Sequence, residues 1–368
     1  MGVDEGQVLR EIAKQVVEVC LRIGEEDMVT INTWHHTVNL AEQLAVECYR
    51  VGAVPLITLM TDKLWYEMMC EISAEKIAKT PLHVLKGLEG ETVCINIHGP
   101  EKPPTPERIR PENMEAIRRA FKPIGRREHE LKIRGADIYL GKVTPQRAKQ
   151  YGFNYSEWRE TILRALATDY KEIKKVGERI AEVLEGASEV NITSNIGTDL
   201  TFRIEGRKTW IDDGIVDEED IERGNLMTVL PTGKIEIAPI ENSANGTIVV
   251  DQPHLILGEK IVNMKWTFEN GKLIKIQADK NVEVFKKYFE KISGEKDRIG
   301  RFIIGLNPEI KPQTLFDMVA LGAVSIAVGH NKDIGGKNEA SAHHEVTIFD
   351  ATVKVDGETI IENGKIKV

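Results

Sequence analysis

The sequence predicts an α/β protein in which an N-terminal parallel α/β sheet domain, residues 1–165, is followed by a β-rich α+β C-terminal domain, residues 166–368. Strand-like and helix-like segments alternate through the first part, which is typical of a parallel sheet wrapped by helices. After the charged helical stretch Tyr155–Gly186, apolar and polar residues alternate, which is typical of antiparallel strands. A chain of 368 residues is also too long for one small core and fits two domains.

The first part contains segments with helical and with strand periodicity in turn. Apolar spacing predicts a helix over Glu5–Ile23, and the nearly continuous apolar run Val54–Met60 is expected to be a parallel strand covered on both faces. Thr144 and Pro145 form a helix start, a capping hydroxyl before a proline, and Gly152 marks the end of that helix. The other expected elements are strands at Val29–Thr33, Val93–Ile97 and Asp137–Leu140, and helices at Val38–Val51, Asp62–Ala78 and Pro111–Phe121.

The turn after the first strand lacks the glycine-rich Rossmann fingerprint and reads Thr33-Trp34-His35-His36-Thr37. Parallel sheets bind ligands at the carboxyl ends of their strands, so Trp34, His35 and His36 are candidates for ligand recognition. Helix capping and loop packing are the commoner roles for such residues, and this interpretation stays open beside the first.

The second part is dominated by short strands. Glu269-Asn270-Gly271 forms a tight turn into the strand Leu273–Gln277, which predicts a hairpin. One helix is expected near Asn281–Ile292, and the acidic segment Ile211–Glu222 is interpreted as a solvated loop. The other predicted strands are Val190–Thr193, Asp199–Ile204, Lys234–Ile237, Gly246–Val250 and Asn263–Phe268.

Composition and charge narrow the classes of partner. A net charge of −9 argues against nucleic acid as the principal partner, and the basic residues between Arg118 and Arg134 are interpreted as a solvated helix face. No run of about 18 apolar residues occurs, so no membrane span is expected. The acidic N-terminus does not resemble a signal peptide, so we expect a cytoplasmic protein. The four cysteines show no CxxC spacing and are expected to be reduced core residues. The abundance of Lys and Glu fits a thermophilic source.

The stretch with the most chemistry runs from Gly329 to Glu345 and reads GHNKDIGGKNEASAHHE. Side chains alternate along a strand, so His343 and Glu345 are expected on one face and His344 on the other. An imidazole beside a carboxylate is half of a plausible metal site. The same pair is also compatible with a surface ion pair. Neither a G-x-S-x-G elbow nor a reactive cysteine context is present, so serine or cysteine nucleophiles are not supported.

Several motifs of the second part resemble those of the thermophilic metalloaminopeptidase family, the aminopeptidase T or leucyl aminopeptidase type. They are Gly197–Phe202 with Glu205-Gly206-Arg207, Asn225–Pro239, Asn245–Ile248, Gly305–Pro308, and Gly335–Asn338 with Ser341-Ala342-His343. The resemblance implies a homodimer with a β-rich catalytic domain. It also implies that two divalent metal ions, zinc or cobalt, activate water to remove N-terminal residues from peptides.

The resemblance places the family's metal ligands unevenly on this sequence. The closing His-x-Asp falls on His343 and Glu345, a chemically acceptable match. Three other ligand positions fall on Lys234, Arg301 and Ser325, two of which are cations.

Two explanations for these replacements stay open. Ligands can have moved, with Glu236 on the same strand face as Lys234 and His330 joining His343 and Glu345 in a two-histidine, one-carboxylate set. Glu236 and Glu345 are then the candidate catalytic carboxylates. Alternatively, Lys234 and Arg301 replace the metal charge and bind an anionic substrate.

The activity expected from the resemblance is therefore metal-dependent aminopeptidase-like hydrolysis. One alternative is a mononuclear iron ring-opening dioxygenase, because dihydroxypyridine dioxygenases resemble this family and use two histidines and a carboxylate. The other alternative is a non-catalytic relative that binds a peptide or another small molecule without metal.

Overall fold

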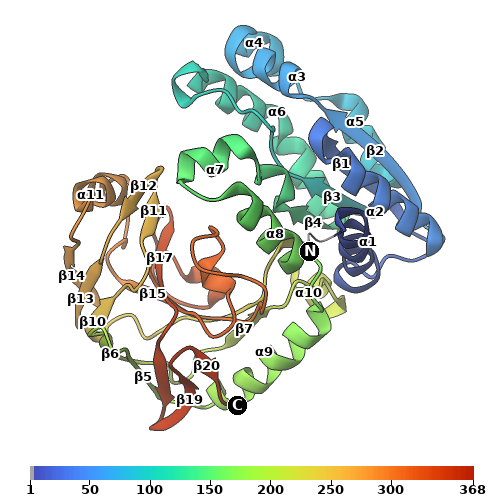
Figure 1. Ribbon diagram of the computed structural model, residues 1–368. Coiled ribbons are helices and arrows are strands. Elements are labelled where there is room, and N and C mark those ends of the chain that lie inside the picture. The colour runs from blue at the N-terminus through green and yellow to red at the C-terminus, as the bar shows by residue number, and fades with distance from the viewer. Residues whose placement is uncertain (1–3) are drawn as a thin grey trace. The chain divides into compact units, whose positions relative to one another are not determined.

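The computed structural model describes residues 4–368 (Figure 1). The chain forms two compact units, and the first comprises residues up to Thr168 together with Gly214–Pro231. The second comprises Asp169–Asp213 and Thr232–Val368. The predicted fold class, a parallel α/β sheet followed by a β-rich part, is confirmed. The boundary between residues 165 and 166 stays a prediction, and it did not include the return of residues 214–231 to the first unit.

The first unit is built on a five-stranded parallel sheet in the order β2-β1-β3-β4-β8. Its first four strands come from the part of the chain where the alternating pattern predicts them. The fifth, β8, comes from the returning segment and pairs with β4. The strands are β1 Met28–Trp34, β2 Val54–Met60, β3 Val93–Ile97, β4 Arg134–Ile138 and β8 Met227–Leu230.

The helices of this unit follow the expected order but differ in their ends. The helix predicted from Glu5 begins as α1 and continues as the π-helix η1, and the helix predicted over Asp62–Ala78 is broken into three pieces. Thr144 caps α7 by accepting from Arg147 N at 3.3 Å, and Gly152 ends it in the left-handed region at φ 68°, as predicted. The α-helices are α1 Glu5–Lys14, α2 Val38–Arg50, α3 Asp62–Tyr66, α4 Ala74–Ile77, α5 Leu82–Gly87, α6 Pro111–Glu130, α7 Pro145–Tyr151, α8 Tyr155–Leu166 and α10 Glu218–Arg223. The π and 3-10 helices are η1 Gln15–Cys20, η2 His35–Thr37, η3 Glu67–Glu71, η4 Leu88–Gly90, η5 Pro106–Arg108 and η6 Tyr139–Lys142.

Two sequence-based expectations for this unit were wrong. Strand β2 is not covered on both faces: it is the edge of the sheet, and Leu56 and Leu59 are 62% and 53% exposed. An apolar run does not distinguish an edge strand from a central one. The acidic segment Ile211–Glu222 is not simply a loop, because Asp217 accepts from Glu219 N and Asp220 N and so caps helix α10.

The second unit contains two large antiparallel sheets and a two-stranded antiparallel sheet formed by His254–Ile256 and Glu259–Ile261. The eight-stranded sheet has the order β14-β13-β10-β6-β5-β18-β19-β20. The predicted hairpin is confirmed between β13 and β14, where Asn270 and Gly271 have φ values of 48° and 76°. The strands of the eight-stranded sheet are β5 Glu189–Thr193, β6 Asp199–Arg203, β10 Asn245–Val249, β13 Lys265–Glu269, β14 Lys272–Gln277, β18 Thr352–Val355, β19 Glu358–Glu362 and β20 Lys365–Ile366.

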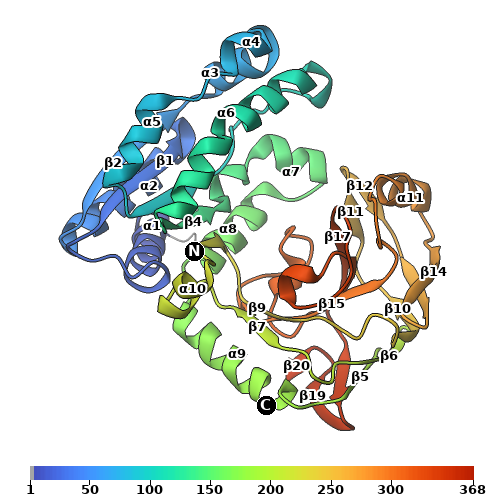
Figure 2. The ribbon, with the colours of Figure 1, turned by 180° about the vertical axis from the view of Figure 1, so that it is seen from behind.

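The five-stranded sheet of this unit has the order β17-β16-β15-β9-β7 and contributes its apolar face to the core. Phe302 on β15 packs edge-on against Phe202 on β6, with ring centroids 5.3 Å apart, and this contact joins the two sheets. The strands are β7 Thr209–Asp212, β9 Lys234–Ile237, β15 Ile299–Gly305, β16 Val324–Gly329 and β17 His343–Ile348. The remaining elements are α9 Tyr170–Leu184, β11 His254–Ile256, β12 Glu259–Ile261, α11 Val282–Glu290, η7 Asp317–Val319 and η8 Lys332–Ile334, several of which Figure 2 shows from behind.

Candidate active site

The polar residues of the second unit share one face of its five-stranded sheet. In the antiparallel register, Glu236 lies opposite Ile303, Ile303 opposite Ser325, and Ala327 is flanked by Arg301 and Glu345. Side chains at paired positions project to the same side of a sheet, so these rows bring Lys234, Glu236, Arg301, Ser325, His343 and Glu345 to a common face. The opposite face is the one that carries Phe302.

Lys234, Glu236 and Arg301 form a buried ion-pair network. Lys234 donates to one carboxylate oxygen of Glu236, and Arg301 Nη1 donates to the other at 2.6 Å. Arg301 Nη2 also donates to both oxygens of Asp333 at 2.6 Å, and Asp212 lies 3.8 Å from Lys234 Nζ. Arg301 and Glu236 are 4% and 6% exposed, so water screens this pair little. The face shared by Lys234 and Glu236, predicted from the strand period, is confirmed by their contact.

The charges in this network support one another. Burial alone would raise the pKa of Glu236, but Lys234 and Arg301 outweigh burial and hold that pKa below its ordinary value. Burial alone would lower the pKa of Lys234, but Glu236 and Asp212 outweigh it and raise that pKa. Both groups are therefore charged at neutral pH. The two cations face three carboxylates, so the network has no excess of positive charge.

His343 and Glu345 form a second, separate pair on the same face. His343 Nε2 lies 4.0 Å from Glu345 Oε2, and their side chains are 39% and 24% exposed. Burial, with the nearby charge of Arg301, lowers the pKa of His343 to about 4, so its imidazole is neutral at pH 7. Burial also raises the pKa of Glu345. A neutral imidazole beside a carboxyl group with a raised pKa is suited to proton transfer.

The structure places His330 with the ion-pair network. Its Nε2 lies 3.6 Å from Asp333 Oδ1, and its Nδ1 is buried without a hydrogen-bond partner among the described residues. Its backbone N–H donates to Ala342 O at 3.2 Å, next to His343. The predicted roles of His330 and Glu236 as metal ligands stay predictions. The role of Glu236 would require at least one of its two ion pairs to open.

The loop that carries Asp333 is fixed by two buried asparagines. Asn331 Nδ2 donates to Gly300 O at 3.1 Å, and Asn338 Nδ2 donates to Ile299 O at 2.8 Å. Asn338 N donates to Asn331 Oδ1 at 2.8 Å, which ties the two ends of the loop together. A Cβ at Gly336 would lie only 2.1 Å from the Asn331 side chain, so the loop needs glycine there. The motif Gly335–Asn338 in this stretch could be recognised from the sequence, whereas the site role of Asp333 could not.

The side chains of His344 and Ser325 are buried and are used in packing and hydrogen bonding. His344 points to the opposite face, as predicted, and its Nε2 lies 3.0 Å from His254 Nε2 within a cluster that includes Trp266, Phe285 and Tyr288. Burial lowers the pKa of His254 to about 4 and the pKa of His344 well below its ordinary value. The buried hydroxyls of Ser325 and Thr347 lie 2.8 Å apart and hydrogen-bond to each other.

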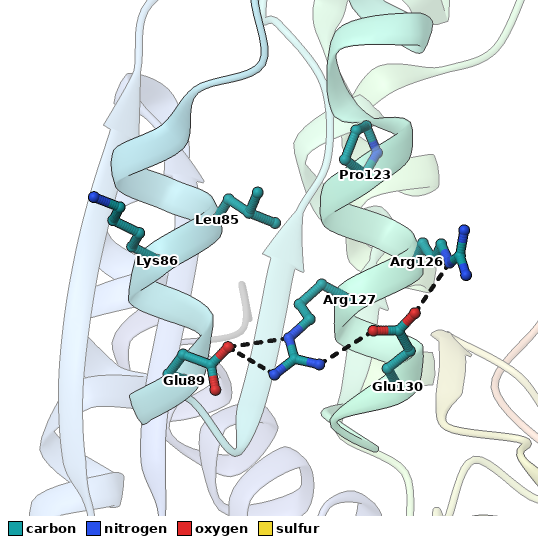
Figure 3. Close-up of a pocket in the computed structure, with 7 residues that line it drawn as sticks. All are labelled: Leu85, Lys86, Glu89, Pro123, Arg126, Arg127 and Glu130. Atoms are coloured by element: carbon teal, nitrogen blue, oxygen red, sulfur yellow. Dashed lines mark hydrogen bonds and ion pairs between the residues drawn. The ribbon is translucent and has the colours of Figure 1, made fainter.

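The first unit has a shallow hollow between α5 and α6 (Figure 3). Arg127 crosses it and donates to Glu89 at 2.7 Å and to Glu130 at 3.1 Å, while Arg126 donates to Glu130 at 3.0 Å. Leu85, Lys86 and Pro123 complete the lining. These exposed ion pairs agree with the interpretation of the basic cluster as a solvated helix face. The interpretation was wrong for Arg134, which lies on β4 and is largely buried in an ion pair with Asp27.

The residues after the first strand are used mainly in packing. Trp34 packs edge-on against Trp65 with ring centroids 5.8 Å apart, and His36 Nε2 lies 2.9 Å from Gly141 O. Next to them, Asn32, Asn96 and Asp137 form a chain of hydrogen bonds across three strands, and His98 lies 3.0 Å from Asp137. These contacts favour the loop-packing interpretation of Trp34 and His36.

Comparison with known protein families identifies the family of this chain. The family model described as thermophilic metalloprotease (M29) matches residues 6–367. The chain belongs to the M29 family. The resemblance found in the sequence motifs is thereby confirmed, and family membership supports metal-dependent aminopeptidase chemistry at the level of the family.

Among M29 relatives, aminopeptidase AmpS of Bacillus subtilis (strain 168) is 28% identical over 185 residues, which cover 44% of each chain. Aminopeptidase T of Thermus aquaticus is 25% identical over 189 residues, 46% of this chain and 44% of the relative. The aligned regions thus span less than half of either relative.

Two solved structures share the fold. Wild-type AmpT from Thermus thermophilus superposes with a TM-score of 0.73 at 20% identity and covers 98% of this chain and 99% of its own. The 2,5-dihydroxypyridine dioxygenase of Pseudomonas putida KT2440 superposes with a TM-score of 0.61 at 16% identity, covering 100% of this chain and 99% of its own. At these identities the likeness shows the fold alone.

The M29 description implies a divalent metal ion, and the side chains around Glu345 do not form a ligand set for one. Within residues 4–368, no three His, Cys, Asp or Glu side chains are grouped so as to hold a metal ion. His343 and Glu345 supply two suitable donors, whereas Glu236 is bound on both oxygens by cations. A zinc site takes three or four ligands from the protein.

None of the helices within the described residues is long and apolar enough to span a membrane.

Proposed function

We propose that this chain is an aminopeptidase-like hydrolase that acts on the N-terminal end of peptides. Membership of the M29 family and the aminopeptidase names of AmpS and aminopeptidase T support this reaction class. The pairing of neutral His343 with Glu345 supports the location of the reactive groups, and it is the observation that carries the proposal.

In the proposed reaction, Glu345 accepts a proton from the water that attacks the peptide carbonyl, and the proton then passes to the leaving amine. His343 orients this water through its neutral imidazole. Lys234 and Arg301 keep Glu236 charged. These three residues lie on the same sheet face as His343 and Glu345. Glu236 receives no proton-transfer role, because cations bind both of its oxygens.

The test is hydrolysis of leucine p-nitroanilide and of short peptides with a free N-terminus. Glu345→Gln should lower kcat at least about 100-fold, the usual contribution of a general base. Glu358→Gln, which changes an exposed carboxylate on β19, should leave the rate unchanged. N-acetylated peptides should not be cleaved. Equal rates for both variants would reject Glu345 as the reactive group.

A second candidate function is binding of a peptide or another small ligand without turnover. The observation that favours it is the ion-paired state of Lys234 and Arg301, which leaves no grouped metal ligands among the described residues. Calorimetric titration with a dipeptide distinguishes the two candidates. Saturable binding without any product would support the binding protein, and product formation would support the hydrolase.

Metal dependence is tested in the same assay. Rates are measured after chelation and after addition of Zn²⁺, Co²⁺ or Fe²⁺, the ions that the sequence analysis suggests. Stimulation by Zn²⁺ or Co²⁺ would support the moved-ligand explanation, and oxygen uptake with Fe²⁺ and a dihydroxylated aromatic would support the dioxygenase.

A homodimer, proposed by analogy with the family, is tested by light scattering.

A further inference from the structure

The family implies a metal ion, but cationic side chains lie among the carboxylates of this sheet face. Lys234 contacts Glu236 directly and lies 3.8 Å from Asp212. It comes from the first position of β9, and the period of two places its side chain on the same face as that of Glu236. An ammonium group between two carboxylates supplies the positive charge that a metal ion would otherwise supply.

Arg301 contributes a second cation to the same group. It binds Glu236 and chelates Asp333 with both contacts at 2.6 Å, and its side chain is almost fully buried. Both contacts to Asp333 come from Arg301 Nη2, and charge-assisted hydrogen bonds of this length are roughly twice as strong as those between neutral groups. Glu236 is therefore neutralised from two sides, and a metal ion that approached it would have to displace one cation and lie beside the other.

We propose that the Lys234 ammonium is the resident cation of this centre, standing where an M29 protein would hold a metal, and that its presence excludes divalent ions. Replacement of Lys234 by a carboxylate then creates a divalent-cation site, formed by position 234, Glu236 and Asp212. Carboxylate oxygens suit hard ions such as Mn²⁺. The raised pKa of Lys234, caused by these carboxylates against the effect of burial, agrees with a permanently charged ammonium.

This inference goes beyond the proposed function, because it concerns ion binding and not turnover. The whole chain is dialysed to equilibrium against Mn²⁺, and in a parallel set against Zn²⁺, and bound metal is measured by elemental mass spectrometry. The wild-type chain and Lys234→Arg, which keeps a cation, should take up no ion above the background. Lys234→Glu should bind Mn²⁺ at least about tenfold more tightly than the wild type, with about one ion per chain.

Two further variants make the result specific. Lys354→Glu makes the same charge change at an exposed position of β18 and should not differ from the wild type. Lys234→Gln removes the charge and adds only a neutral amide oxygen. If Lys234→Glu does not fold, Lys234→Gln replaces it and should still take up more Mn²⁺ than Lys234→Arg. Mn²⁺ should raise the Tm of Lys234→Glu but not that of Lys234→Arg, since an ion that binds only the native state stabilises it.

Each outcome decides the proposal. Stoichiometric uptake of Zn²⁺ or Mn²⁺ by the wild-type chain would overturn it without any variant. Equal uptake by Lys234→Glu and Lys354→Glu would also overturn it, because the gain would then come from net charge. If the wild-type chain does not hydrolyse peptides but the variants show the expected ion binding, only the proposed function is rejected.

Discussion

At the residue scale, the buried carboxylate of Glu236 is compensated by two cations from different strands. Lys234 binds it from the same strand, β9, and Arg301 binds it from β15. Asp333, from the segment between β16 and β17, binds Arg301 in turn. Removal of either cation therefore leaves Glu236 with one partner.

The first prediction concerns the buried Arg301–Glu236 pair. Arg301→Met should reduce the free energy of unfolding by roughly 3 kcal/mol, because removal of one partner leaves a buried carboxylate with less compensation. Lys234 still pairs with Glu236, which keeps the loss near the lower end of the usual range. Urea unfolding measures the change. Arg126→Met, at an exposed position of α6, should cost less than about 0.5 kcal/mol, and a similar cost for both variants would contradict the argument.

A second residue-scale prediction concerns the histidines held neutral by burial. The folded-state pKa of His254, about 4, lies below the ordinary value of 6.5, so the unfolded chain binds more protons between these limits. Stability should therefore fall as the pH is lowered from about 6.5 to about 4. His254→Phe should make the Tm depend less on pH in this range, whereas His83→Gln, at an exposed position, should not. An unchanged slope in His254→Phe would show that His254 does not titrate with unfolding.

The contacts of the site could be predicted from the strand period only in part. The residues of the pairs Lys234–Glu236 and His343–Glu345 are two positions apart on one strand, so their shared faces could be predicted. Asp333 approaches Arg301 from a different segment of the chain, and no periodicity relates the two, so this ion pair could not be predicted.

At the element scale, the sequence predicts which segments are strands better than where those strands lie in a sheet. Val54–Met60 is β2 with the predicted bounds, yet its place at the sheet edge exposes residues expected to be buried. Partner order depends on contacts between distant segments, and the apolar pattern of one strand carries no information about them. The hairpin of β13 and β14 could be predicted because its register is local and its turn residues are diagnostic.

The loop between β16 and β17 gives an element-scale prediction. Gly336→Ala should reduce the free energy of unfolding by roughly 1–3 kcal/mol, because the new Cβ overlaps the buried Asn331 side chain. Gly87→Ala is the matched control: it lies in α5 with nothing within 4 Å of the added Cβ, and it should be neutral or slightly stabilising. Chemical denaturation of both variants provides the comparison. A loss in Gly87→Ala as large as that in Gly336→Ala would show that the effect is not caused by overlap with Asn331.

At the scale of the whole molecule, the two-part organisation could be predicted from the sequence. The return of residues 214–231 to the first unit could not. The change of periodicity after the charged helices marks where the β-rich part begins. The segment Gly214–Pro231 is too short to show a composition of its own, and its strand β8 pairs with β4, about 90 residues away in the sequence. Only the tertiary pairing reveals that this segment completes the first sheet.

The last prediction tests this organisation with fragments. A fragment that ends at residue 165 lacks β8 and the buried residues Leu226 and Leu230, and it exposes the edge of β4. An uncovered edge strand promotes association, so this fragment should aggregate or unfold at low urea concentration. A chain that joins residues 1–168 to Gly214–Pro231 through a long Gly/Ser linker should remain monomeric and unfold cooperatively. Light scattering and urea unfolding distinguish the two. If the shorter fragment is as stable and as soluble as the linked one, β8 is dispensable and the boundary predicted from the sequence is sufficient.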